Sequence, residues 1–103
     1  MPKPRLLVAR PVPEAVTHRA RTDFDAILSE DRDLTPDDVI ARLTEHKADA
    51  LFFSSNLKLN AALIARLPPT VRIAATCSVG FDHIDVPAAQ ARGLIVTNTP
   101  EVL

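Results

Sequence analysis

Five short apolar runs recur along the chain, and segments with the spacing of helices separate them. We predict strands at residues 5–10, 24–29, 48–54, 71–76 and 94–98, each buried on both faces of a sheet. Parallel neighbours in a sheet need a crossover connection between them. The regular alternation of strand and helix therefore predicts a parallel sheet with helices on both of its faces.

The clearest predicted helix lies within residues 34–47. Thr35 is placed to cap it, and Pro36 occupies the first helical position. Asp37 and Asp38 follow in the first turn, where the positive end of the helix dipole favours acidic side chains. The apolar stripe of this helix consists of Val39, Ile40 and Leu43.

Three further helices are predicted from their end signals. One begins at Asn60 and ends before Pro68, and another begins at Asp85 and ends at Gly93, which can adopt a left-handed backbone conformation. A helix that opens at Pro13 has a thinner pattern. Its apolar stripe contains only Val16, Ala20 and Phe24.

These elements predict a single α/β domain over residues 1–103. For a five-stranded parallel sheet of this size we expect the strand order 2-1-3-4-5, in a flavodoxin-like three-layer sandwich. A ligand of such a sheet binds beyond the carboxyl ends of the strands. The loops to inspect for function are therefore those after Arg10, Ser29, Ser54, Thr76 and Asn98.

The charge balance argues against nucleic acids and membranes as partners. The 12 basic and 13 acidic residues give a formal charge of −1, and the basic residues are scattered along the chain. The apolar runs are too short to span a bilayer or to form a signal peptide, so we expect a cytoplasmic protein. We interpret the single Cys77, which cannot form an internal disulfide, as a small buried apolar residue rather than a reactive thiol.

Two common uses of this fold do not suit the sequence. A nucleotide-phosphate loop at the first strand–helix turn needs amide donors, but Pro11 and Pro13 supply none and no glycine is present there. We therefore expect the chain to bind no dinucleotide or flavin by itself. A phospho-receiver domain needs acidic residues after the first strand, an Asp after the third and a Lys after the fifth. These positions hold Ala9 and Arg10, Ser54 and Ser55, and Asn98 and Thr99.

The three histidines lack a second ligand at metal-binding spacing. We expect His18 and His46 to lie on helix surfaces. His83 lies between Asp82 and Asp85, where a catalytic or metal-binding role is one interpretation. We favour the simpler one, a solvated loop residue.

One strand–helix turn does suit ligand binding, the segment TCSVGFDHID after the fourth predicted strand. Gly80 lets the backbone approach a ligand, and successive amides after a strand can hold a carboxylate without a charged side chain. The simpler interpretation is that Gly80 only permits a sharp turn. The spacing alone favours this simpler interpretation, partly because Asp82 and Asp85 would repel an anion unless they point away.

The run CSVGFDHIDVPAAQARGLIVTNTP resembles the end of the substrate-binding, or lid, domain of D-2-hydroxyacid dehydrogenases, in the glyoxylate/hydroxypyruvate reductase branch. The shared features are a strand, the SVGFDHID turn, a helix with AAQARG, and a strand ending in NTP. The other predicted elements agree with the family in order and length. The resemblance thus covers the whole chain but rests mainly on residues 78–100.

The resemblance implies a set of substrate-binding residues. The backbone amides of Val79 and Gly80 would hold the substrate carboxylate. The loop of Ser54, Ser55 and Asn56 would line the same cleft.

The resemblance also implies a hinge, formed by Asn98, Thr99 and Pro100, that leads into a nucleotide-binding domain. The family's catalytic Arg, Glu and His and its GxGxxG loop lie beyond that hinge. We therefore expect no catalytic residue, cofactor site or metal site in residues 1–103. In that family a returning C-terminal segment packs on this domain, so its absence would leave apolar surface exposed.

We interpret the chain as the lid domain of an NAD(P)-dependent enzyme, cut off before the nucleotide-binding domain. The parent enzyme would reduce glyoxylate, hydroxypyruvate or a related 2-oxo acid by hydride transfer from NADPH or NADH, and the chain alone would be inactive. The alternative is an isolated folding or interaction module with no catalytic role. It would hide its apolar surface in a homodimer, with the fifth strand pairing with or exchanging into a second copy.

Overall fold

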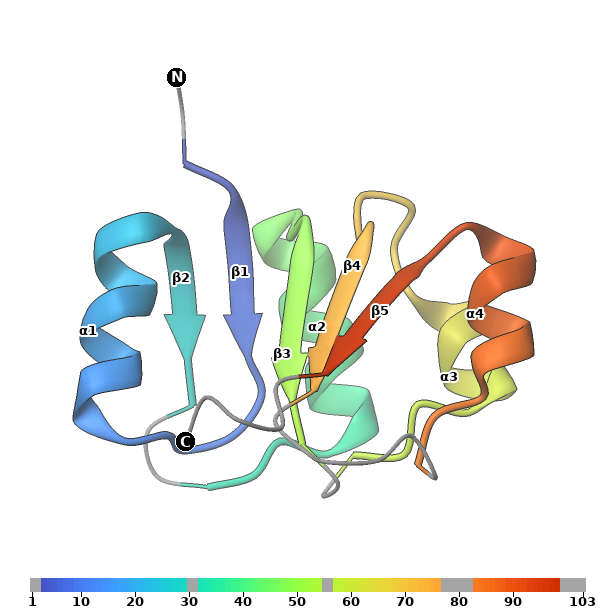
Figure 1. The fold of residues 1–103 in the computed structure, drawn as a ribbon, viewed down its shortest axis with the longest axis horizontal. Helices are drawn as coiled ribbons and strands as arrows, with labels where there is room; N and C mark the ends of the chain where they lie inside the picture. The colour runs from blue at the N-terminus through green and yellow to red at the C-terminus, as the bar shows by residue number, and fades with distance from the viewer. Residues whose placement is uncertain (1–2, 30–31, 55–56, 77–82, 99–103) are drawn as a thin grey trace.

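The computed structural model describes residues 3–29, 32–54, 57–76 and 83–98, which form a five-stranded parallel sheet flanked by helices (Figure 1). The strand order is β2-β1-β3-β4-β5, which confirms the predicted fold class and topology. Each strand lies within its predicted range but is shorter. The elements are β1 (Arg5–Val8), α1 (Glu14–Asp23), β2 (Asp25–Leu28), α2 (Pro36–His46), β3 (Ala50–Phe53), α3 (Ala61–Arg66), β4 (Ile73–Thr76), α4 (Val86–Arg92) and β5 (Ile95–Asn98).

The predicted helix ends are confirmed. Thr35, Asn60 and Asp85 cap α2, α3 and α4, and each side-chain oxygen accepts a hydrogen bond from the amide three residues further on, over 3.2, 2.9 and 3.1 Å. Each cap satisfies an amide that has no partner within its helix. Gly93 ends α4 in the left-handed conformation, with a φ of 81°. In the described part of the chain, no helix has the length and apolar character that crossing a membrane requires.

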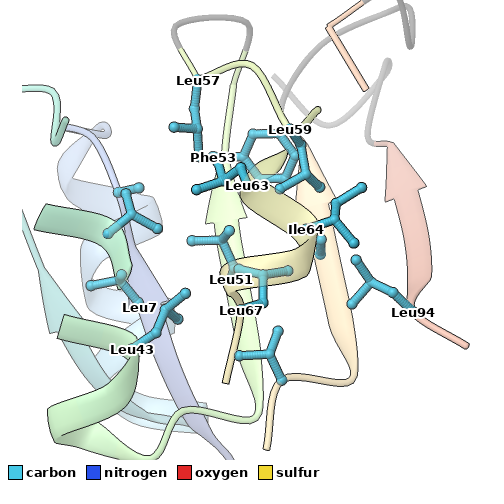
Figure 2. Close-up of a cluster of buried hydrophobic side chains, with 14 of the residues drawn as sticks. Leu7, Leu43, Leu51, Phe53, Leu57, Leu59, Leu63, Ile64, Leu67 and Leu94 are labelled. Carbon is cyan, nitrogen blue, oxygen red and sulfur yellow. The ribbon is translucent and has the colours of Figure 1, made fainter. Parts of the chain in front are cut away.

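The main hydrophobic core fills the space between one face of the sheet and the helices α2, α3 and α4 (Figure 2). Figure 2 shows side chains from β1, β3, α2 and α3 meeting in this layer, with those of the segment after β3 beside them. This packing holds the carboxyl ends of β3 and β4, from which two of the candidate loops depart. Its fully buried members include Leu7, Val39, Leu43, Leu51, Phe53, Leu57 and Leu59.

The opposite face of the sheet is covered less completely. Leu6 and Val8 pack there with Ala20 of α1, in a second, smaller cluster. Ile73 of β4 and Ile95 of β5 are partners in the strand register, and they are 39% and 56% exposed. The prediction that every strand is buried on both faces is therefore wrong for this side of the sheet, because α1 is the only described helix that packs on this face and it lies beside β1 and β2.

Candidate functional site

Three buried polar residues gather at the carboxyl edge of the sheet. Ser29 follows β2, Ser54 follows β3 and Thr76 ends β4, and these residues are 8%, 3% and 0% exposed. No other polar or charged residue in the described part of the chain is buried. A polar group is costly to bury unless it is hydrogen-bonded, so their concentration marks this edge as the candidate site. Open parallel sheets bind their ligands at the same edge.

Arg10 connects the first and third strands at this edge. Its Nη1 donates a hydrogen bond of 2.7 Å to Oγ of Ser54, and its Nε donates one of 3.1 Å to the carbonyl oxygen of Pro11. The bond to Ser54 is within reach because β1 and β3 are neighbours in the sheet. The guanidinium is partly buried, and no carboxylate of the described residues lies within ion-pair distance of it.

His83 closes the connection between β4 and α4. Its Nε2 lies 2.9 Å from Oγ1 of Thr76, and its ring meets that of Phe53 edge-on, with centroids 5.7 Å apart and planes at 70°. Aromatic rings favour this arrangement over face-to-face stacking. The preferred interpretation of His83 as a solvated loop residue is therefore wrong. The side chain is partly buried and contacts a fully buried threonine.

A short parallel bridge between Leu59 and Ile84 joins the segments that follow β3 and β4. The amide of Leu59 donates a hydrogen bond of 2.8 Å to the carbonyl of His83, and the amide of Asp85 donates one of 2.9 Å to the carbonyl of Leu59. Leu59 and Ile84 are both buried. Because they precede α3 and α4, the bridge holds the two helix starts side by side and fixes the far ends of both candidate loops.

Two of the predicted site residues can be placed. Ser54 lies at the carboxyl edge directly after β3, and Asn98 is the last residue of β5 at the same edge. The other predicted site and hinge residues, Val79, Gly80, Ser55, Asn56, Thr99 and Pro100, lie outside the described residues, as does Cys77.

Sequence reasoning missed Arg10 and Thr76 as interacting residues. The only sequence signal for these two residues is a polar side chain at the end of an apolar run. Several other residues of the chain share this feature, so it does not single out Arg10 and Thr76. Their partners, Ser54 and His83, could not be found without the strand order and the path of the chain into α4.

The other two histidines differ in how far they are exposed to solvent. His18 is exposed on α1, as predicted. The prediction that His46 is a surface residue is wrong, because its side chain is 14% exposed and its Nε2 lies 2.8 Å from the carbonyl oxygen of Asp25. Within the described ranges, no three or more His, Cys, Asp or Glu residues are grouped as metal ligands.

The carboxyl edge also carries a small hollow of about 280 Å³, lined by Lys58, Asn60, His83, Ile84 and Asp85. A larger hollow of about 790 Å³ lies elsewhere, along α3 and α4, and is lined mainly by alanine and aliphatic side chains. We assign the candidate site to the edge, because precisely placed polar groups orient a small ligand and these groups lie there.

The β1–α1 connection does not fit the phosphates of a dinucleotide. A phosphate cradle needs several backbone amides that point at the ligand. The amide of Ala9 donates instead to the carbonyl of Phe52 at 2.9 Å, and Pro11 and Pro13 have no amide hydrogen. Three positions of the first strand–helix turn, where doubly wound nucleotide-binding domains hold the phosphates, therefore offer no amide to a phosphate.

A parallel sheet of this order defines a doubly wound α/β domain, a fold class whose ligands bind at the carboxyl edge of the sheet. Residues 6–103 match the family model of the D-isomer specific 2-hydroxyacid dehydrogenase, catalytic domain. The chain belongs to this dehydrogenase family.

Comparisons with individual proteins agree with this assignment. The chain is 40% identical over 101 residues to glycerate dehydrogenase of Hyphomicrobium methylovorum, covering 97% of the chain and 31% of that enzyme. It is 34% identical over 103 residues to glyoxylate reductase of Thermofilum pendens, covering 100% of the chain and 30% of that enzyme. A crystal structure from Polaromonas, of an NAD-binding D-isomer specific 2-hydroxyacid dehydrogenase, superposes with a TM-score of 0.87 and 36% identity over 99% of this chain and 32% of that one. The chain thus spans about a third of the length of these proteins.

Proposed function

We propose that residues 1–103 act as the substrate-binding domain of an NAD(P)-dependent D-2-hydroxyacid dehydrogenase that reduces glyoxylate, hydroxypyruvate or a related 2-oxo acid. The observation that carries the proposal is the family match over residues 6–103. The names of the relatives, glycerate dehydrogenase and glyoxylate reductase, support a small hydroxy or oxo acid as the substrate.

In this proposal the carboxyl edge of the sheet faces the substrate. The amides of Val79 and Gly80 hold the substrate carboxylate, and the loop 54–56 lines the same cleft. The bonds of Ser54 to Arg10 and of Thr76 to His83 support this assignment, because they anchor the residues from which both loops depart. An anchored loop keeps its amides oriented before the substrate arrives, which lowers the entropic cost of binding.

The remaining functions of the enzyme belong to a second, nucleotide-binding domain that Asn98, Thr99 and Pro100 connect to this one. The coverage of about 31% of the glycerate dehydrogenase and the poor fit of the β1–α1 connection to a dinucleotide support this division. NADPH or NADH bound to that domain supplies the hydride. Closure of the present domain over the cleft excludes water from the reaction. A cytoplasmic location is part of the same proposal.

The experiment that tests the proposal uses the full-length enzyme and follows NADPH and NADH oxidation with glyoxylate and hydroxypyruvate. Gly80→Val should raise KM by about 10- to 100-fold, because a side chain there displaces the substrate carboxylate, while circular dichroism remains that of the folded enzyme. Val79→Ala is the matched control, since it keeps the backbone amide and should leave KM nearly unchanged.

An unchanged KM in Gly80→Val would contradict the assignment of the carboxylate site. Residues 1–103 alone should give no 2-oxo-acid-dependent oxidation of NADPH or NADH. Turnover by the purified chain would show that the division between two domains is wrong.

A second candidate function is self-association of an isolated module, which the exposed pair Ile73 and Ile95 favours. β5 is an edge strand of the sheet, so a second copy can pair with it or exchange it. Light scattering should then give a dimer that Ile95→Glu dissociates and that Ala62→Glu, an exposed change on α3, leaves intact. A monomer at all accessible concentrations would eliminate this candidate.

A further inference from the structure

Arg10 has no acidic partner among the described residues, whereas four other arginines each have one. Arg5, Arg19, Arg32 and Arg66 each lie within ion-pair distance of an aspartate carboxylate. Arg10 is partly buried, and its partners are the hydroxyl of Ser54 and the carbonyl of Pro11. A partly desolvated positive charge without a carboxylate partner gains from binding an anionic or strongly accepting group.

Arg92 provides an instructive contrast. It also has no acidic partner in the part of the chain that the structure describes, but its Nη1 and Nη2 donate hydrogen bonds of 2.6 Å to the carbonyls of Ile64 and Pro68, in and beyond the last turn of α3. Both ends of that guanidinium are used in the fold. The Nη2 group of Arg10, by contrast, has no hydrogen-bond partner among the described residues, so it remains able to donate to a ligand.

Arg10 follows β1 at the carboxyl edge of the sheet, the edge to which the candidate site is assigned. Its guanidinium already reaches from β1 to Ser54 at the end of β3, and β4 is the next strand, about 5 Å further along the sheet. In the proposed function the segment after β4 holds the substrate carboxylate. In that arrangement the other end of a three-carbon acid would extend along the same edge of the sheet, on which Arg10 lies. Because a guanidinium only donates hydrogen bonds, the group that it meets must be an acceptor.

We propose that Arg10 is a substrate-recognition residue, which donates a hydrogen bond to an oxygen on the third carbon of the 2-oxo acid. This inference rests on the proposed function. The interaction favours hydroxypyruvate, which carries a hydroxyl on that carbon, over glyoxylate, which has no third carbon. Ser54 acts beside Arg10 by accepting the bond that fixes the orientation of the guanidinium.

The test measures kcat/KM of the full-length enzyme for hydroxypyruvate and for glyoxylate. Arg10→Met should lower the value for hydroxypyruvate by about 10- to 100-fold, the loss expected for one hydrogen bond to a charged group, and change that for glyoxylate less than about 3-fold. Arg10→Lys keeps the charge and should recover part of the loss for hydroxypyruvate. Arg19→Met, which removes an exposed arginine of α1, is the matched control and should change neither value.

Comparing the two substrates distinguishes a role of Arg10 in substrate recognition from a role in stabilising the fold. Glyoxylate activity reports whether each variant is folded and whether the carboxylate site is intact, so equal losses for both substrates would overturn the inference and assign Arg10 to the fold. The absence of any loss would overturn it too, as would a wild-type enzyme that reduces glyoxylate but not hydroxypyruvate. A wild-type enzyme that reduces no 2-oxo acid with either nucleotide would instead refute the proposed function.

Discussion

The hydroxyl of Thr76 and Nε2 of His83 lie 2.9 Å apart and join the end of β4 to the residues that lead into α4. Thr76 is fully buried, and the ring of His83 is held edge-on against Phe53. The segment 77–82, which contains the proposed carboxylate site, therefore begins and ends at two residues that contact each other. The Leu59–Ile84 bridge adds a second connection one residue beyond His83.

The first prediction concerns this contact. Thr76→Val and His83→Phe keep the approximate shape of each side chain but remove the hydrogen bond. In a double-mutant cycle on urea unfolding, the two changes should couple by about 1 kcal/mol, the net worth of one hydrogen bond. Thr76→Ser keeps the hydroxyl and should preserve the coupling with His83→Phe. Strictly additive effects of the two substitutions would show that the contact contributes nothing to stability.

The second prediction concerns acid pH. The hydrogen bond of 2.9 Å from Arg32 Nη1, followed by that from the side chain of Thr35, holds the pKa of Asp38 below its usual value. The pKa is thus lower in the folded than in the unfolded chain. The stabilisation by the carboxylate is fully present above the unfolded-state pKa and is lost as the pH falls through the folded-state pKa.

Asp38→Asn should therefore reduce stability at neutral pH and flatten the decline of stability in the acid range, as measured by denaturant unfolding at several pH values. The effect should be small, since the Arg32–Asp38 pair is exposed to solvent and screened. Asp33→Asn, an exposed change in the same connection, is the control for the removal of one surface carboxylate. Parallel profiles for wild type and Asp38→Asn would contradict the assigned cause.

The third prediction concerns the connection between α3 and α4. Arg92 donates to the carbonyls of Ile64 and Pro68, in addition to the backbone amides that these two carbonyls accept from, and so ties α4 to the end of α3 and the turn after it. Arg92→Met keeps much of the apolar stem and should lower the free energy of unfolding by about 2 kcal/mol. Arg66→Met removes an exposed ion pair with Asp37 and should cost less than about 1 kcal/mol. Equal costs for the two variants would indicate that the carbonyl contacts do not stabilise the chain.

The fourth prediction concerns the end of α4. Gly93 has a φ of 81°, and no atom of the described residues, apart from Gly93 and its two chain neighbours, lies within 4 Å of the position that a Cβ would occupy. Gly93→Ala should therefore destabilise by about 1 kcal/mol through backbone strain alone. Gly93→Asn should cost less, because asparagine tolerates the left-handed region better. The thermal unfolding midpoints of both variants provide the measurement, and an equal loss would point to a cause other than backbone conformation.

Local signals account for the parts of the fold that the sequence predicts well. Thr35, Asn60 and Asp85 cap the predicted helices because a capping side chain bonds to an amide only three residues away. The strand order follows from the strand–helix alternation, since right-handed crossovers leave few ways to arrange five parallel strands. Ser54 could be assigned to the carboxyl edge in the same way, as the polar residue after the third strand.

The tertiary structure alone decided which of these residues meet and which surfaces stay exposed. Arg10 and Ser54 are 44 residues apart and bond only because β1 and β3 are adjacent, and His83 departs from its predicted solvated state because Phe53 and Thr76 converge on it from two strands. The sequence pattern predicts Ile73 and Ile95 to be buried strand residues, but both are exposed, because the described helices do not cover this part of the sheet. The sequence thus determined the elements and their ends, which depend on near neighbours. Contacts between distant residues depend on how strands and helices pack, and that packing is a property of the whole chain.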